Sequence, residues 1–204
     1  MDPHRHWNAI YTKKHEHEVS WFEAVPAVSL RLLEAAGLNE ETCVIDVGGG
    51  DSHLIDHLTA RGLDCLAVLD VSDAALQRAR TRLGSKADVP IWLEANVVGD
   101  WSLKPMDIWH DRAVFHFLTD PEDRSRYLDH LRLTLKSGGA AIIATFALEG
   151  PETCSGLRVM RYSPGSLLQT LGADFELMES VDYVHQTPWG TPQAFQYSRF
   201  KRVH

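Results

Sequence analysis

The hydrophobic and polar positions of this chain alternate between short apolar runs and longer segments with helical spacing. The short runs predict strands at residues 43–47, 65–69, 90–93, 106–109, 140–146, 175–184 and 194–200. Apolar residues three and four apart predict helices at 26–36, 53–60, 74–83 and 166–171, and one from Asp120 to a glycine cap at Gly138. Repeated strand–helix units predict an α/β fold with a mostly parallel, doubly wound sheet and helices on both faces.

The last two predicted strands have no helix between them. Residues 186–193 contain Pro188, Gly190 and Pro192, which oppose a helix in so short a connection. Parallel strands need a long crossover, whereas antiparallel strands need only a turn. We therefore expect an antiparallel last strand to complete the sheet.

Residues 1–42 precede the first strand and are too long for a simple tail. They contain Trp7, Tyr11, Trp21 and Phe22, followed by an amphipathic helix. These side chains fit either a lid over the ligand-binding edge of the sheet or plain packing against the core. We expect residues 1–42 to form a helical, aromatic lid and residues 43–204 to form the binding sheet, within a single domain.

Composition places the chain among ordinary globular proteins. It has 204 residues, of which 44% are hydrophobic and 24% charged, and this size suits one domain. No apolar run approaches the roughly 20 residues needed to cross a bilayer. The N-terminus lacks the basic start and apolar stretch of a signal peptide. We expect a cytoplasmic protein with no membrane partner.

The net charge, the cysteines and the histidines each indicate which partners and sites this chain lacks. A net charge of −8 disfavours nucleic acid as a partner, because phosphates repel an acidic surface. Three widely spaced cysteines do not form a disulfide framework, so Cys43 and Cys65 are expected to be buried thiols in two strands. His15 and His17 lack metal-ligand spacing, and no metal site is expected.

A glycine turn follows the first predicted strand, in the sequence Asp46-Val47-Gly48-Gly49-Gly50-Asp51-Ser52. Glycines let a ligand approach the backbone, and the helix after the turn presents free N–H groups. The dinucleotide pattern needs glycine where His53 stands, and no phosphate-binding loop occurs. Asp70 ends the second strand, 22 residues after Gly48, where a carboxylate accepts hydrogen bonds from both ribose hydroxyls. The alternative for Asp70 is a helix cap.

These motifs resemble those of class I S-adenosylmethionine-dependent methyltransferases, which have a Rossmann-like sheet. The resemblance covers roughly residues 40–147 by motif, and the whole chain resembles small bacterial members with no settled acceptor. It implies S-adenosylmethionine as cofactor, with the turn around its methionine part, Asp70 at its ribose and Asn96 at its adenine. The implied cofactor-binding residues are Asp46, Gly48, Gly49, Gly50, Ser52, Asp70, Val71, Asn96, Val97 and Asp111.

The resemblance also implies that residues beyond the fourth and fifth strands face the methyl acceptor. The candidate catalytic residues are Asp111, His116 and Tyr11, with His116 as a base of nearly neutral pKa. The competing interpretations are an ion pair between Asp111 and Arg112 and packing of His116 between phenylalanines. The candidate substrate-binding residues are Trp7, Trp21, Arg112, Cys154, Arg158, Arg161 and His185. Arg158 and Arg161 fit an acceptor carboxylate or, alternatively, surface pairing with Glu149 or Glu152.

We expect methyl transfer to a small-molecule acceptor, because a compact acidic chain with an aromatic cover carries no added recognition domain. A protein lysine methyltransferase is the alternative, which the Asp51-Ser52 turn and the Trp21-Phe22 pair favour. A regulatory protein that binds the cofactor without turnover is a further alternative, because the same motifs serve binding and catalysis. The acceptor atom (nitrogen, oxygen, sulfur or a metalloid) and the choice between monomer and homodimer stay open.

Overall fold

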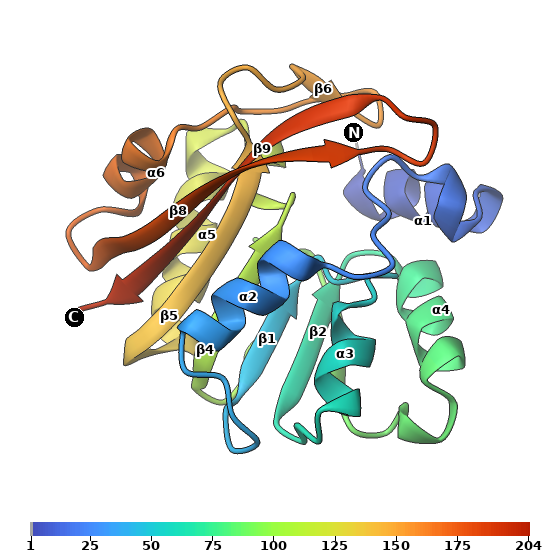
Figure 1. Cartoon of the computed structure of the whole chain (residues 1–204), viewed down its shortest axis with the longest axis horizontal. Coiled ribbons are helices and arrows are strands. Elements are labelled where there is room, and N and C mark those ends of the chain that lie inside the picture. Colours follow the sequence, from blue (N-terminus) through green and yellow to red (C-terminus); the bar gives the residue numbers. More distant parts are fainter. Residues whose placement is uncertain (1) are drawn as a thin grey trace.

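A computed structural model describes residues 2–204, and a seven-stranded sheet of order β3-β2-β1-β4-β5-β9-β8 forms its centre (Figure 1). The strands are β1 (Val44–Val47), β2 (Leu66–Asp70), β3 (Ile91–Glu94), β4 (Met106–Arg112), β5 (Leu135–Phe146), β8 (Phe175–Gln186) and β9 (Pro192–Arg202). β9 runs antiparallel to both of its neighbours, and every other neighbouring pair in this sheet is parallel. The predicted α/β sheet with an antiparallel last strand is therefore confirmed.

Helices cover both faces of the sheet and bury one apolar core on each. One core contains residues of α2 (Ala27–Ala35), α3 (Leu54–Ala60) and α4 (Asp73–Leu83), and the other contains residues of α5 (Pro121–Thr134) and α6 (Pro164–Leu171). Alternate residues of β1 divide between these cores, with Val44 on the α2 side and Ile45 on the α5 side. This alternation decides which core each polar strand residue faces.

The first helix, α1 (Pro3–Lys13), lies in the predicted lid, at a position that the apolar pattern does not mark. Its start has a local signal, because Asp2 accepts hydrogen bonds from the first turn and proline stands at the first helical position. Asn8 Oδ1 accepts from Ser72 Oγ (2.7 Å) and from the Ala74 N–H (3.2 Å). These bonds hold α1 beside the start of α4 (Figure 1).

The largest boundary error lies between α5 and β5. The helix was expected to end at a glycine cap at Gly138, but α5 ends at Thr134 and β5 begins at Leu135, which pairs with Met106. A Cβ at Gly139 would lie 2.8 Å from the Asp107 carbonyl oxygen. Glycine is therefore needed here for close passage of β5 along β4, and not for a helix cap.

The remaining elements are short. They are the small hairpin of β6 (Thr153–Cys154) and β7 (Leu157–Arg158), and the 3₁₀ turns η1 (Glu16–Glu18), η2 (Gly84–Lys86) and η3 (Phe115–Phe117). The hairpin occupies the loop that was expected after β5. It lies at the same end of the sheet as α1 (Figure 1). None of the helices in residues 2–204 combines the length and apolarity needed to cross a membrane.

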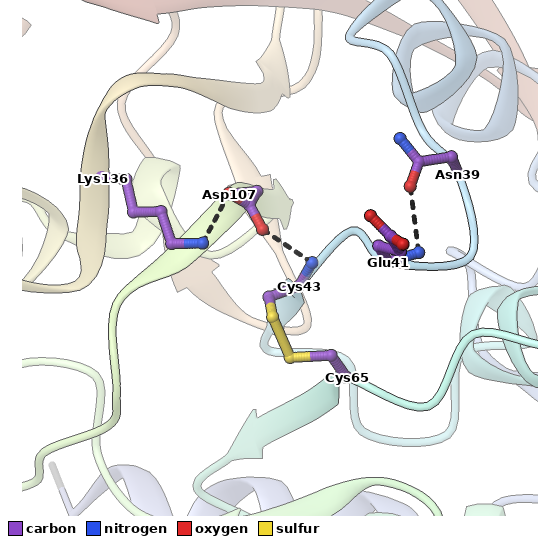
Figure 2. The surroundings of a disulfide bond; sticks show 6 residues. All are labelled: Asn39, Glu41, Cys43, Cys65, Asp107 and Lys136. Carbon is purple, nitrogen blue, oxygen red and sulfur yellow. Dashed lines mark hydrogen bonds and ion pairs between the residues drawn. A yellow bond between two sulfur atoms is a disulfide. The ribbon is translucent and has the colours of Figure 1, made fainter.

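Cys43 and Cys65 form a disulfide, which corrects the expectation of two buried thiols (Figure 2). Each cysteine directly precedes a strand, and Val44 of β1 pairs with Leu66 of β2. This parallel register places the two sulfur atoms side by side at the amino end of the sheet. Disulfides are rare in reducing compartments, so the bond argues against the expected cytoplasmic location, which stays a prediction.

Reduction of the Cys43–Cys65 bond is expected to lower the free energy of unfolding by about 3 kcal/mol. The bond joins cysteines 22 positions apart and restricts the unfolded chain. Urea titrations with and without reductant measure this difference. A Cys43→Ser, Cys65→Ser variant should have the same free energy of unfolding as the reduced wild-type protein, with and without reductant. An unchanged wild-type midpoint, with both thiols shown to be free, would contradict the expectation.

Candidate functional site

A cavity of about 480 Å³ lies at the carboxyl ends of the parallel strands, where doubly wound sheets bind their ligands. Its volume is in the range of small-molecule sites. The strand ends supply one side, and α1, the segment around Trp21 and the β6–β7 hairpin supply the other. The candidate residues that line it are Trp7, Tyr11, Trp21, Gly48, Asp70, Val71, Asn96, Val97, Arg112, Cys154 and Arg158.

The glycine turn requires glycine for steric reasons. Gly48 has a φ of +66°, and a Cβ there would lie 2.0 Å from a methyl group of Val114. Gly50 has a φ of +38°, and a Cβ there would lie 2.7 Å from Asp70 Oδ2. The absence of side chains thus lets the turn pack directly against the carboxylate at the end of β2.

The two residues after the turn support its shape and do not line the main cavity. Asp51 forms ion pairs with Arg78 and Arg82 of α4. Ser52 Oγ accepts a hydrogen bond from the Leu54 N–H (3.1 Å) at the start of α3. Ser52 therefore has a capping contact, and its predicted contact with cofactor is not visible in the cavity lining.

Asp70 combines burial with exposure to the cavity on one side. It is 7% exposed, and its Oδ1 accepts from the Ser72 N–H (2.8 Å). Burial, with a smaller contribution from the nearby Asp46 carboxylate, raises the pKa of Asp70 to about 7. The helix-cap alternative does not describe Asp70, because Ser72 Oγ caps α4 by accepting from the Ala75 N–H.

A buried polar chain that the sequence did not reveal leads from Asp46 to α2. His110 Nδ1 donates to Asp46 Oδ1 (2.7 Å), and His110 Nε2 lies 2.9 Å from Ser29 Oγ. All three residues are at most 3% exposed. Asp46 and His110 are direct neighbours in β1 and β4, a contact that only the strand order discloses. Asp46 Oδ2, below Gly49, is buried without a hydrogen-bond partner among residues 2–204.

Asp111 does not reach the cavity, which corrects its predicted roles as catalytic and cofactor-binding residue. Its side chain is fully buried on the α5 face of the sheet. It accepts from the N–H groups of Val114 (2.9 Å) and Phe115 (3.1 Å) and from the Tyr127 hydroxyl (2.6 Å). These bonds hold the turn after β4, in which Ala113 has a φ of +69°.

The predicted base His116 is also enclosed and lines no part of the cavity. Its ring is fully buried and packs against Phe117 and Phe146, at centroid distances of 4.5 and 4.8 Å. Burial, together with the Arg112 charge, lowers the pKa of His116 to about 3. His116 is therefore not placed to act as the predicted base. It is a neutral side chain packed between phenylalanines, which was the competing interpretation.

Tyr11 lines the cavity, but its acidity does not suit a base. Burial and the neighbouring Asp70 carboxylate hold the pKa of Tyr11 well above its usual value. Tyr11 therefore stays neutral near pH 7 and can donate a hydrogen bond. Its ring meets Trp21 edge to face at 6.0 Å, and Trp21 meets Trp7 in the same way at 5.7 Å.

Arg112 and His185 fasten residues 20–23 to the sheet. Arg112 donates to the Trp21 carbonyl (2.8 Å) and lies 3.3 Å from Glu23, so the ion pair with Asp111, which was the competing interpretation, does not form. His185 donates to the Ser20 carbonyl (2.6 Å) and also lies 3.3 Å from Glu23. His185 is 2% exposed and does not line the cavity, which corrects its predicted role in substrate binding.

The residues from the loop after β5 differ in their placement. Arg158 and Cys154 line the cavity, whereas Arg161 lies outside it and pairs with Glu152 (3.0 Å), as its surface alternative holds. Burial raises the pKa of the Cys154 thiol, which stays protonated at neutral pH. In residues 2–204 we find no group of three or more His, Cys, Asp or Glu side chains arranged to hold a metal ion.

Comparison with known proteins shows a relation in sequence. Residues 45–141 match the family model of a methyltransferase domain. The chain is 27% identical over 123 residues to the EEF1A lysine methyltransferase 2 of Danio rerio. The aligned region covers 57% of this chain and 53% of that protein. The chain thus spans about half the length of this relative.

Solved structures share the fold at low sequence identity. The N-methyltransferase NodS of Bradyrhizobium japonicum WM9, in complex with S-adenosylhomocysteine, has a TM-score of 0.75 and 14% identity, over 100% of both chains. The 1,6-didemethyltoxoflavin-N1-methyltransferase of Burkholderia thailandensis has a TM-score of 0.72 and 15% identity, over 99% of this chain and 84% of that one. Residues 45–141 therefore match a methyltransferase domain, and the chain as a whole shares the fold of these two methyltransferases.

Proposed function

We propose that this protein is an enzyme that transfers the methyl group of S-adenosylmethionine to a small-molecule acceptor. The observation that carries the proposal is one continuous cavity that joins two kinds of lining. Asp70, Asn96 and Gly48 lie along the strand ends, and aromatic side chains lie along the lid. The first lining would hold the cofactor, and the second would hold the acceptor next to it.

The strand-end residues fit this cofactor in their chemistry. Asp70 presents a buried carboxylate, which suits the two hydroxyls of a ribose. Val71, Asn96 and Val97 follow along the same wall and would enclose the adenine. Asp46 does not line the cavity, but its unpartnered Oδ2 lies beneath Gly49, and its negative charge would attract the cationic methionine end.

The chemistry needs positioning more than acid–base groups. The bound cofactor supplies an electrophilic methyl carbon; a lone pair of the acceptor forms the new bond while the carbon–sulfur bond breaks and its electrons stay on sulfur. The chain's part is to align the acceptor, exclude water and hold the cofactor. Because His116 is enclosed and Tyr11 stays neutral, neither of these two candidate residues would accept a proton from the acceptor.

We also propose that residues 1–42 act as the lid of this site. Trp7, Tyr11 and Trp21 line the cavity from the lid side. Two contacts hold the lid in place. Asn8 of α1 accepts a hydrogen bond from Ser72 at the start of α4, and His185 donates one to the Ser20 carbonyl. An aromatic cover over the cavity favours a small molecule over the side chain of a folded protein. A cytoplasmic location and a monomeric or homodimeric state remain predictions.

The sequence relation to a lysine methyltransferase supports the alternative acceptor, and binding without turnover is the further alternative. Incubation of the enzyme with methyl-labelled cofactor and a cell extract, followed by separation of protein from small molecules, distinguishes them. We expect label in the small-molecule fraction, and clearly less of it with an Asp70→Asn control at a cofactor concentration that just saturates the wild-type protein. Label in protein would establish the lysine alternative. Label in neither fraction, with S-adenosylhomocysteine bound in calorimetry, would establish binding alone.

A further inference from the structure

We propose that the acceptor is a small planar aromatic acid, whose ring lies among the aromatic side chains that line the cavity and whose carboxylate faces Arg158. This inference rests on the proposed function and specifies its substrate class. It follows from two properties of the acceptor side of the cavity, which are the shape of its apolar walls and the balance of its charges.

The walls are aromatic and come from separate elements. The rings that line the cavity here are Trp7, Trp21, Phe117, Phe146 and Phe195. Trp7 meets Phe117 edge to face at 5.2 Å, and Phe146 meets Phe195 edge to face at 4.8 Å. Rings set at steep angles offer both faces and edges to a planar guest. Such walls favour a flat unsaturated molecule over a flexible aliphatic chain.

Aromatic walls alone would also suit an ammonium group, so the charges decide between an acid and an amine. Arg112 already places its guanidinium 5.2 Å from the centre of the Phe195 ring, and Glu23 neutralises it. The two carboxylates of the cavity, Asp70 and Asp123, come from β2 and α5, which supply none of these rings.

Of the two arginines that line the cavity, Arg158 is the one without a counterion among residues 2–204. It is exposed on β7 and lines the cavity, and no carboxylate within residues 2–204 lies at ion-pair distance from it. The acceptor side therefore holds a neutral Arg112–Glu23 pair and one free positive charge. A ligand with a single negative charge complements this arrangement, whereas a lysine ammonium is repelled by it.

The test uses pairs of small molecules that share a ring and differ in charge. Protein saturated with S-adenosylhomocysteine is titrated in a calorimeter with indole-3-acetate against tryptamine, and with phenylacetate against phenethylamine. We expect each acid to bind at least tenfold more tightly than its amine, with a preference that declines at high ionic strength because Arg158 is exposed.

Substitutions of Arg158 test whether its positive charge causes the preference for acids over amines. Arg158→Gln should weaken binding of the acids about tenfold, and Arg158→Glu should invert the preference toward the amines. Arg126→Gln removes an exposed arginine of α5 outside the cavity and should leave binding of the acids unchanged.

The outcomes separate this inference from the proposed function. Amines that bind as tightly as the acids, or acids that fail to bind the saturated protein, would overturn the aromatic-acid assignment and leave methyl transfer standing. A preference for acids that persists in Arg158→Glu would overturn the role of Arg158. Failure of S-adenosylhomocysteine itself to bind would instead overturn the proposed function.

Discussion

Asp70→Asn is expected to weaken binding of S-adenosylhomocysteine roughly 10- to 100-fold. The buried carboxylate would accept hydrogen bonds from two ribose hydroxyls, and an amide replaces one of its acceptor atoms with a donor. Hydrogen bonds to a charged group contribute about 1.5–3 kcal/mol each, and 1.4 kcal/mol corresponds to a tenfold change in affinity. Isothermal titration calorimetry measures the loss directly.

The same residue gives the affinity a dependence on pH. Burial raises the pKa of Asp70 to about 7 in the free protein, and ribose hydroxyls donate preferentially to the ionised form. Affinity should therefore rise with pH up to about 7 and level off above it, whereas Asp70→Asn should give a flat profile. The folding stability of the ligand-free protein should depend on pH in the opposite direction. The pKa of Asp70 is higher in the folded than in the unfolded protein, so the stabilisation from its protonated carboxyl is lost as the pH rises from about 4 to 7.

Asp129→Asn is the matched control, because Asp129 is exposed on α5 and lies outside the cavity. Its affinity and pH profile should follow those of the wild-type protein. An Asp70→Asn protein that binds as tightly as wild type, or that keeps the same dependence on pH, would remove Asp70 from the ribose site.

Asp111→Ala is expected to reduce the free energy of unfolding by roughly 3–5 kcal/mol. The substitution leaves the N–H groups of Val114 and Phe115 and the Tyr127 hydroxyl without their acceptor. Each orphaned buried group costs about 1–3 kcal/mol, and the desolvation that raises the pKa of Asp111 to about 6 offsets part of the total. Urea unfolding followed by circular dichroism measures the change.

Tyr127→Phe is the companion variant, because it removes one donor to Asp111 and leaves both backbone bonds intact. It also leaves the Trp109 indole N–H without its acceptor, which the hydroxyl provides at 2.8 Å. We expect a smaller loss, of about 1–3 kcal/mol. Equal stability of Asp111→Ala and wild type would show that the turn after β4 does not depend on this carboxylate.

The fold was predictable because its signals are local. Apolar runs such as 140–146 and the turn residues around Pro188 and Gly190 determine strands and connections within a few residues. The errors lie where tertiary contact outweighs local preference. Gly138 resembles a helix cap, yet pairing of Leu135 with Met106 starts the strand earlier.

In the candidate site too, residues in local motifs were predictable, whereas contacts between distant residues were not. Gly48 and Asp70 belong to continuous motifs, so their place at the cavity was foreseeable. The partner of Asp46 is His110, 64 positions away, and that of His185 is Ser20, 165 positions away. Such pairs follow from strand order and from the path of the lid. His116 shows the converse error, because a sequence position next to the site does not specify whether the side chain turns toward it.

The Cys43–Cys65 bond also changes what a break in the backbone would mean. Together with the bond, residues 43–65 form a covalent ring that contains β1, the whole glycine turn and α3. A protease that nicks the exposed connection near Gly62 would leave both fragments joined, and only added reductant would separate them on a denaturing gel. The glycine turn, which we propose holds the methionine end of the cofactor, is thus tethered at both of its ends, independently of the packing around it.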